Sequence, residues 1–313
     1  MSLPKDKIEQ SNSGFSVTFS ADKTVLKSVV ITPPAEYTVP DGVEEIGEKA
    51  FYNCKNFRKI NLPDGLKVIR KKAFEGCANL EILTIPDTVT NIEPRAFFGC
   101  KNLKKVIIPD GIKEISKSSF ENCFSLEYVS VPDSVVEIDE RAFFDCYNLS
   151  EIIISSYLKS IGWKAFKGCE SLEYFYSPEG LETIYDNAFL CCRNLKEITL
   201  PQSLKYLGRG AFTGCENAEK IEISENISLI QAHTFSGCKK VKTIRLPEKT
   251  EKIEWRAFGF NDNLEEIYLS DNLKEIDNEA FLNCKNFKKL LIPSTCLYGI
   301  EYAKSNGIPY EEI

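Results

Sequence analysis

The chain has 313 residues, 43% of them apolar and 27% charged, and its formal net charge is −7. Its Lys and Arg residues are scattered along the sequence, which argues against a protein that binds DNA or RNA. No apolar run approaches the roughly 18 residues that a membrane-spanning helix needs, so we expect no insertion into a membrane.

The first 36 residues combine a polar tail with two apolar stretches. Phe15, Val17 and Phe19 alternate with polar residues, and a second apolar stretch runs from Val25 to Ile31. Alternation of this kind is typical of a strand with one buried face. The open end of a stack of strands needs a cover, so we expect residues 1–36 to form a polar tail and an N-terminal β cap.

Residues 37–296 form eleven repeats of 23 residues. Each repeat is marked by a Phe and, three residues later, by a Cys, a row that is interrupted at Asn261. The recurring Phe residues are Phe51, Phe74, Phe97, Phe120, Phe143, Phe166, Phe189, Phe212, Phe235, Phe258 and Phe281. A repeat this regular indicates a solenoid, because a single unit cannot bury its apolar side without stacking on its neighbours.

Within each repeat the apolar positions predict a short strand followed by a return of the chain. Two apolar residues such as Ile60 and Leu62 follow the Cys by six and eight positions and favour a strand with one face inward. Pro63 comes next, as Pro does in eight of the repeats, and ends the strand because Pro has no N–H to donate. A second apolar pair, Leu66 and Ile69, carries the chain back across the unit.

The spacing around the Phe completes the predicted fold. Phe, Cys and the next apolar residue stand at i, i+3 and i+6, which suits a helical or 3₁₀ turn with one buried face. A crossover of this length makes consecutive strands parallel. We therefore predict a β-dominated, curved, right-handed solenoid, with a parallel β-sheet on one face and short strands and 3₁₀ or helical turns on the other.

The Asn and Cys rows have structural interpretations. Eight repeats carry Asn two residues after the Cys position, where we expect left-handed backbone geometry before the next strand. The Cys side chains of neighbouring repeats point the same way, whereas a disulfide needs converging Cβ atoms, so we expect a row of buried free thiols. Cys191 stands beside Cys192 at a variable position and is expected to be the most exposed thiol. The sequence has no CxxC pair, so we expect no metal and no cofactor.

The last residues, 297–313, predict a C-terminal cap with a short helix. Leu297, Ile300 and Ala303 lie on one helical stripe, and Gly307 is suited to end the helix. We expect this helix to cover the open end of the last repeat.

The full repeat pattern is clearest in residues 92–115, IEPRAFFGCKNLKKVIIPDGIKEI. The pattern, Ile-x4-Phe-x2-Cys-x2-Leu-x2-Ile-x-Ile-Pro-Asp, resembles the BspA-like leucine-rich repeat family over about residues 37–296. The resemblance implies a leucine-rich repeat solenoid without catalytic residues. It also implies a bacterial surface-type protein, since members of the family have been implicated in adhesion to host proteins and other cells.

The sequence offers no set of residues for catalysis. His233 is the one histidine, and it lies two residues before a repeat Phe, where other repeats carry Lys49, Arg95 or Lys164. We expect this row to face solvent, away from any cleft of the strand face, and no nucleophile or general base has a credible partner. Gly-rich phosphate loops are also absent. We therefore expect a protein that is not an enzyme.

The candidate binding surface consists of the outward strand positions, five and seven residues after the Cys. Within five consecutive repeats these positions gather apolar and aromatic residues, which is typical of a partner-binding patch. The candidate partner-binding residues are Ile82, Ile107, Tyr128, Ile153, Tyr174 and Tyr176. Strand formers also pack against each other across a sheet without binding anything, so the patch has two interpretations. From Thr199 onward the same rows become charged, and Ser177 breaks an inward apolar row beside the patch.

Two functions fit these observations. The first is a cell-surface or secreted binding module of the adhesion type, which holds a host or cell-surface protein or a glycan on its strand face. The second is an intracellular scaffold for protein–protein interaction. The chain starts Met1-Ser2-Leu3-Pro4 without a signal peptide, so a cytoplasmic location stays open beside the surface location that the resemblance implies. In both cases we expect a monomer that binds neither nucleic acid nor membrane.

Overall fold

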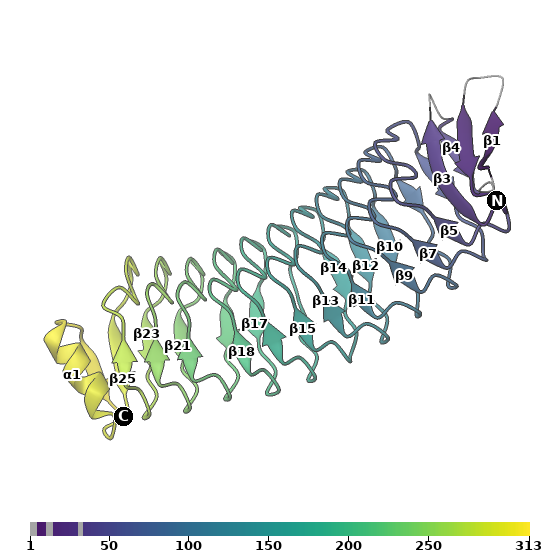
Figure 1. Ribbon diagram of the computed structural model, residues 1–313. Helices are drawn as coiled ribbons and strands as arrows, with labels where there is room; N and C mark the ends of the chain where they lie inside the picture. The colour runs from purple at the N-terminus through teal and green to yellow at the C-terminus, as the bar shows by residue number, and fades with distance from the viewer. Residues whose placement is uncertain (1–4, 11–14, 31–33) are drawn as a thin grey trace. The chain divides into compact units, whose positions relative to one another are not determined.

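The computed structural model covers most of the chain (Figure 1). It describes residues 5–10, 15–30 and 34–313. Ile31, at the end of the second apolar stretch of the expected cap, and the start from Met1 to Pro4 lie outside the described residues. The chain divides into two compact units, of which unit 1 ends at Tyr157 and unit 2 begins at Leu158.

Unit 1 begins with antiparallel strands and continues as two parallel ladders. Its strands are β1 (Lys7–Gln10), β2 (Ser16–Phe19), β3 (Val25–Val30), β4 (Glu36–Thr38), β5 (Glu45–Ile46), β6 (Lys59–Asn61), β7 (Val68–Ile69), β8 (Ile82–Leu83), β9 (Asn91–Ile92), β10 (Lys105–Ile107), β11 (Glu114–Ile115), β12 (Tyr128–Ser130), β13 (Glu137–Ile138) and β14 (Glu151–Ile153). Strand β2 pairs antiparallel with β1 and β3, and β3 pairs in parallel with β5. The long ladder consists of β4–β6–β8 and β10–β12–β14, and the short ladder of β5–β7–β9 and β11–β13.

Unit 2 repeats the two-ladder plan and ends with a helix and a strand. Its elements are β15 (Ser160–Ile161), β16 (Thr183–Ile184), β17 (Glu197–Thr199), β18 (Tyr206–Leu207), β19 (Lys220–Glu222), β20 (Leu229–Ile230), β21 (Thr243–Arg245), β22 (Lys252–Ile253), β23 (Glu266–Tyr268), β24 (Glu275–Ile276), β25 (Lys289–Ile292), α1 (Leu297–Ser305) and β26 (Tyr310–Glu312). The long ladder consists of β17–β19 and β21–β23–β25, and the short ladder of β15–β16–β18 and β20–β22–β24.

The C-terminal segment closes the last repeat of unit 2. Helix α1 buries Gly299, Tyr302 and Ala303, whereas Leu297, which we placed on its apolar stripe, is exposed. The chain turns at Gly307, whose φ is +63°, and β26 then pairs in parallel with β25. The open edge of the long ladder is thus covered by a strand of the chain itself.

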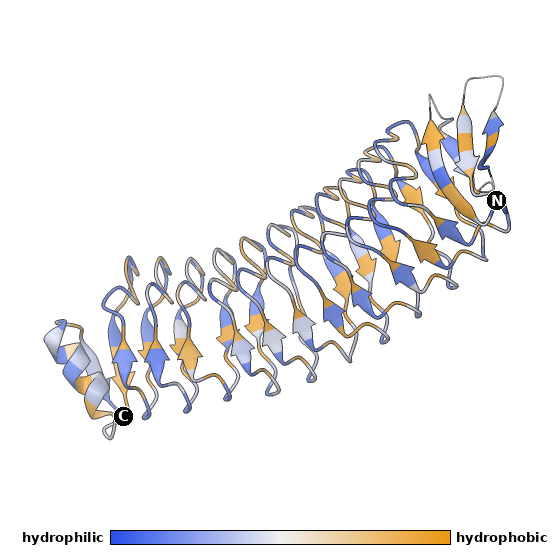
Figure 2. Ribbon diagram, in the orientation of Figure 1, coloured by the Kyte–Doolittle hydropathy of each residue, from blue (hydrophilic) through white to orange (hydrophobic). Residues whose placement is uncertain are grey.

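Pairing within the ladders places equal repeat positions side by side. Lys105 faces Tyr128, and Tyr128 faces Glu151. Because side chains alternate along a strand, the inward row that includes Val106 and Val129 is buried. Figure 2 shows the resulting alternation of apolar and polar residues along the strands of both units. The leucine-rich repeat solenoid predicted from the sequence is confirmed.

The Phe row forms the apolar centre of each unit. From Phe51 to Phe143, ring centroids of consecutive Phe residues lie between 4.9 and 5.5 Å apart, and their planes are within 9° of parallel. In unit 2 the same spacing from Phe166 to Phe281 lies between 5.1 and 6.1 Å. Aromatic pairs of this kind stabilise a core beyond the area that they bury.

The Cys row links neighbouring repeats through hydrogen bonds. The Sγ of Cys77 donates to the backbone O of Phe51 at 3.0 Å, and the contact recurs along the row, for example from Cys146 to Phe120 at 3.2 Å. Burial raises the pKa of Cys123 to about 12, which keeps the thiol protonated as a donor. All twelve cysteines lie within the described residues and are free. This role explains why a small thiol, rather than another apolar residue, occupies the row.

The turn around each Phe contains residues with left-handed backbone geometry, at positions other than the expected Asn row. The N–H of Cys54 donates to the O of Phe51 at 3.0 Å, as in a 3₁₀ turn. Positive φ occurs two residues before and two after the Phe, as at Lys49 and Asn53.

The Asn row two residues after the Cys is not left-handed. Positive φ at these Asn positions does not occur in the described part of the chain, so the sequence-based expectation is wrong. Several of these side chains instead form a ladder between repeats. Asn217 Nδ2, for example, donates to Asn194 Oδ1 at 2.8 Å. The row is therefore explained by hydrogen bonds between side chains rather than by backbone geometry.

The repeat that contains Tyr174, Phe175 and Tyr176 forms no strand there, although these residues are among those described. The Phe175 ring packs 5.5 Å from Phe166 and 4.8 Å from Phe189, measured between centroids. Other repeats place a smaller aliphatic residue at this inward position. A Phe therefore occupies the inward position where the strand is missing, and the expectation that both tyrosines stand on a strand is wrong.

Candidate binding surface on the strand ladders

Unit 1 holds four of the six predicted binding residues, all on its long ladder. Ile82 on β8, Ile107 on β10 and Ile153 on β14 are 51%, 56% and 49% exposed. Tyr128 on β12 is half-buried, and the Lys105 ammonium lies 4.8 Å from its ring centroid. Three isoleucines therefore project from a strand face that is otherwise mostly polar.

Tyr174 and Tyr176 belong to unit 2. Their rings stack with centroids 6.1 Å apart, and they are 41% and 80% exposed. Ser177, the break in the inward row, lines a small hollow of about 140 Å³ together with both tyrosines. Lys196 approaches the Tyr174 ring to 5.1 Å and pairs with Glu173 at 2.5 Å. The tyrosine pair thus forms a separate aromatic surface within unit 2.

The long ladder of unit 1 is interrupted between β8 and β10, which belong to separate sheets. A hollow of about 500 Å³ lies at this interruption. We call it the unit 1 hollow. Leu83 and Ile85 are buried and form its floor, while Ile82 and Ile107 stand at its sides. Lys104 lines the hollow just before β10 begins.

A second hollow lies at the equivalent interruption in unit 2, between β19 and β21. This unit 2 hollow has a volume of about 770 Å³, and its positions match those of the unit 1 hollow six repeats further along the chain. Lys220 and Arg245 occupy the places of Ile82 and Ile107. The Lys220 ammonium pairs with Glu222 at 2.7 Å. The two hollows therefore share a position in the repeat and differ in chemistry.

The short ladders are also interrupted near both hollows, and a polar side chain replaces a backbone donor at each interruption. Elsewhere in unit 1 a backbone N–H bonds the carbonyl at the end of the preceding short strand, as Glu93 N–H does to Ile69 at 2.9 Å. Between β9 and β11 the Ser116 hydroxyl donates to the Ile92 carbonyl instead, at 2.7 Å. In unit 2 the side-chain Nε2 of Gln231 donates to the carbonyl that ends β18, at 3.0 Å. Each carbonyl stays satisfied although the ladder is broken.

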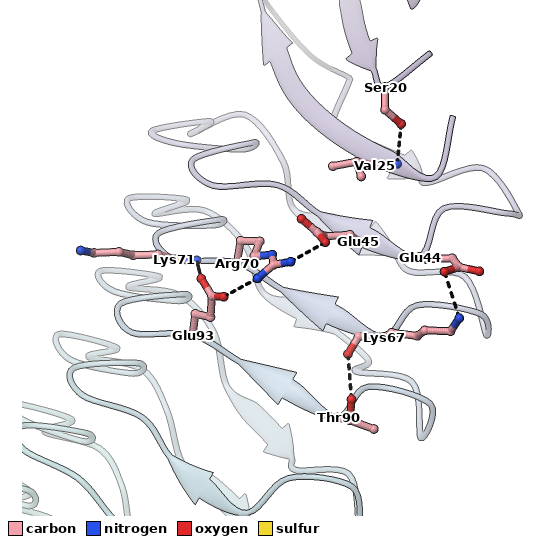
Figure 3. Close-up of polar contacts among 9 residues, drawn as sticks. All are labelled: Ser20, Val25, Glu44, Glu45, Lys67, Arg70, Lys71, Thr90 and Glu93. Carbon is pink, nitrogen blue, oxygen red and sulfur yellow. Dashed lines mark hydrogen bonds and ion pairs between the residues drawn. The ribbon is translucent and has the colours of Figure 1, made fainter. Parts of the chain in front are cut away.

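Ion pairs dominate the short-ladder side of unit 1 (Figure 3). Arg70 lies between Glu45 and Glu93 and donates to them at 2.8 and 2.9 Å. Lys67 pairs with Glu44 at 2.9 Å. Exposed pairs of this kind contribute little to stability.

His233 lines a third hollow, of about 420 Å³, beside the short ladder of unit 2. Ala232 is small in a row where Arg209 and Trp255 are large, which leaves space between the two. The His233 ring lies 4.7 Å from the Trp255 ring, and burial, followed by the charges of Arg256 and Arg209, lowers the pKa of His233. The row was expected to face solvent, and the His233 side chain is instead half-buried beside Trp255. The described residues contain no cluster of three or more His, Cys, Asp or Glu that could hold a metal.

Comparison with known proteins settles the family. A model of the BspA type leucine-rich repeat region matches the chain over residues 33–150, 68–193, 136–258 and 206–306. The chain belongs to the BspA-type leucine-rich repeat family. A search of curated protein sequences gives no match. Among the described residues no helix is both long and apolar enough to cross a membrane.

Solved structures of bacterial proteins share the BspA-type fold. A leucine rich cell surface protein from Faecalibacterium prausnitzii is 26% identical, with 92% of this chain and 95% of that chain covered and a TM-score of 0.56. A leucine-rich repeat protein from T. pallidum is 26% identical over 67% of this chain and 91% of its own, with a TM-score of 0.51. A leucine-rich repeat protein from Bacteroides ovatus is 21% identical over 100% of this chain and 99% of its own, with a TM-score of 0.56, and shows the fold alone.

Sequence reasoning found the exposed isoleucines and missed the hollows. The strand positions of Ile82 and Ile107 follow from the repeat, but the repeat pattern is unbroken where the ladders part. One signal was available: Ser116 and Gln231 are polar residues next to the ends of short strands, able to take over a backbone hydrogen bond. Their effect on the ladder required the structure.

Proposed function

We propose that this chain is a non-enzymatic binding module of the adhesion type, located at a bacterial cell surface or secreted, which holds a protein or glycan partner on its strand face. The observation that carries the proposal is the group of half-exposed isoleucines at Ile82, Ile107 and Ile153 on the long ladder of unit 1. Exposed apolar side chains on an otherwise polar face favour partner binding, since burying them removes apolar area from water. The similarity to a protein named as a cell surface protein supports the location.

The test is a binding assay of the full chain on a panel of extracellular matrix proteins and an array of host glycans. The variants Ile107→Ser and Tyr174→Ser separate the surfaces of unit 1 and unit 2. We expect a loss of affinity of about tenfold or more for the surface that binds, as for truncated interface anchors. Circular dichroism and thermal melting check that both variants stay folded. Unchanged affinity in both folded variants contradicts the proposal and assigns the residues to sheet packing.

A second function, an intracellular scaffold for protein–protein interaction, is favoured by the cysteines. Twelve free thiols are common in reducing compartments, whereas secreted proteins tend to pair theirs. Treating intact cells of the source organism with a protease that cannot enter them distinguishes the two locations. Digestion of the protein on intact cells supports the surface function, and protection until lysis supports the scaffold.

A further inference from the structure

We propose that the unit 1 hollow binds a linear segment of a partner protein, which places one large apolar side chain over Leu83 and Ile85 and a carboxylate beside Lys104. This inference rests on the proposed function and narrows it. It names a protein segment, rather than a glycan, as the partner of one part of the strand face.

The shape and lining of the hollow favour an apolar side chain. Its volume of about 500 Å³ lies within the range of roughly 300–1,000 Å³ that is usual for ligand pockets. Leu83 and Ile85 close the floor, and Ile82 and Ile107 border it with more than half of their surface exposed. No aromatic ring is among these described lining residues, so a sugar ring has no surface on which to stack. An apolar side chain of a partner protein would bury the isoleucines and remove their apolar area from water, which favours it over a sugar ring as the occupant.

The charge at one end of the hollow favours a carboxylate. Arg58, which stands two repeats before Lys104, pairs at 2.9 Å with Glu81, one of the two acidic residues that line the hollow. Lys104 holds the same repeat position as Arg58, and the parts of the chain that are described give it no ion pair. The neighbouring Lys105 ammonium is directed to the Tyr128 ring instead. Lys104 is therefore an exposed cation without an ion pair among the described residues just before β10, whereas Asp87 lines the part of the hollow that follows β8. A carboxylate of the partner can form a charge-assisted hydrogen bond with Lys104.

The interruption of the ladder also frees backbone groups for a main chain. At the next junction, Glu127 N–H donates to the Lys104 carbonyl at 2.8 Å. The corresponding bond from Lys104 N–H to the Glu81 carbonyl is missing between these described residues, because β8 and β10 are not paired. A donor and an acceptor at the rim can thus bond the backbone of an extended segment, as exposed strand edges do in peptide recognition.

The unit 2 hollow provides a comparison within the same molecule. It has the same position in the repeat, but Lys220 and Arg245 replace the two isoleucines. The Arg245 guanidinium lies 4.0 Å from the Tyr268 ring centroid, and Lys240 pairs with Glu219 at 3.8 Å. An apolar side chain gains little from these charged walls, so we assign segment binding to unit 1 alone.

The experiment selects peptides on the full chain and then measures them on variants. A phage-displayed library of random dodecapeptides is panned on the immobilised wild-type protein, and enriched peptides are synthesised with a fluorophore. Fluorescence polarisation gives their affinity for the wild type, Ile107→Ser, Lys104→Glu and Ile153→Ser. Ile153→Ser is the matched control, because Ile153 occupies the same repeat position with similar exposure but lies outside the hollow.

We expect enriched peptides to share a large apolar residue with Asp or Glu within about three positions. Ile107→Ser should weaken binding by about tenfold or more, and Ile153→Ser by no more than about twofold. Lys104→Glu should weaken the binding of the acidic peptides to a similar degree. When the library is panned on the Lys104→Glu variant, the enriched peptides should carry basic residues in place of Asp or Glu. Circular dichroism confirms that each variant is folded.

Absence of a shared motif, indifference to Lys104→Glu, or equal losses in Ile107→Ser and Ile153→Ser would each overturn the assignment. These failures differ from failure of the proposed function. The chain can fail these peptide tests and still bind a matrix protein or glycan of the panel. If that binding depends on Ile153 or Tyr174, the strand face is a binding surface and only the role assigned to the hollow is wrong.

Discussion

The two hollows show how one repeat position produces two different surfaces. Both lie where the long ladder is interrupted, between β8 and β10 in unit 1 and between β19 and β21 in unit 2. Their buried floors are aliphatic in both units, but Ile82 and Ile107 in the first correspond to Lys220 and Arg245 in the second. The inward rows are fixed by packing, whereas the outward rows are free to change. The difference between the hollows is therefore a difference in surface chemistry and not in the fold.

The largest expected effect tests whether the core is the same beside both hollows. Phe97 stacks on Phe74 at 5.3 Å in unit 1, and Phe235 stacks on Phe212 at 5.8 Å in unit 2, each across the interrupted junction. We expect Phe97→Ala and Phe235→Ala each to lower the free energy of unfolding by about 3–5 kcal/mol, the usual cost of deleting a buried Phe. Urea denaturation followed by circular dichroism measures both. A cost that differs severalfold between the two would mean that the hollows differ in their cores as well.

A smaller effect concerns one turn in each unit, of which the first holds an ion pair and the second a neutral hydrogen bond. The buried Glu75 carboxylate accepts two hydrogen bonds from Arg95 at 2.9 Å. At the same repeat position seven repeats later, in unit 2, the Ser236 hydroxyl donates to the Gly259 carbonyl at 3.0 Å. Glu75→Gln should cost about 1–3 kcal/mol, because it leaves Arg95 without its charge partner in a partly buried site.

The acid response distinguishes these turns. The hydrogen bond and charge of Arg95 outweigh desolvation by burial and lower the pKa of Glu75. A lowered folded-state pKa means stability that is present above the unfolded-state pKa and is lost as the pH falls through the folded-state value. The loss of stability between pH 5 and pH 3 should therefore be smaller in Glu75→Gln than in the wild type. Ser236→Ala, which removes no titrating group, serves as the control and should leave that acid loss unchanged.

An exchange of surface residues tests the comparison directly. Lys220→Ile combined with Arg245→Ile gives the unit 2 hollow the isoleucines of the unit 1 hollow, and Lys242 already stands at the position of Lys104. We expect the double variant to bind a second copy of the selected peptide, with an affinity within about tenfold of the first site. Isothermal titration calorimetry gives the stoichiometry. A ratio that stays at one peptide per chain would show that the isoleucines alone do not make the site.

The smallest expected effect is the pH dependence from His233 in unit 2. Burial and two nearby arginines lower its folded-state pKa, so the unfolded chain takes up this proton more readily than the folded one. Stability should therefore fall as the pH drops through the unfolded-state pKa of about 6.5. His233→Gln should reduce the difference in urea midpoint between pH 7.5 and pH 5.5. An unchanged difference would contradict the half-buried environment of His233.

The sequence determined the fold because every repeat has apolar residues at the same positions and must bury them against its neighbours. The Phe, Cys and aliphatic residues recur every 23 residues, so neighbouring repeats pack in the same way along the chain. The exposed isoleucines could be located for the same reason, since alternation along a strand decides which side chains point outward. The sequence-based prediction of left-handed geometry for the Asn row was wrong. Asn is favoured both in left-handed turns and in ladders of side-chain hydrogen bonds, so the residue type alone does not distinguish the two.

The tertiary structure decided what happens between repeats. Strand pairing is missing at particular repeats, for example around Phe175 in unit 2 and beside Ser116, between β9 and β11, in unit 1. A repeat pattern records which residues face inward and carries no measure of the distance between adjacent turns. The unit 1 hollow lies where β8 and β10 are not paired, and so the place that we propose for a partner segment became visible only in three dimensions.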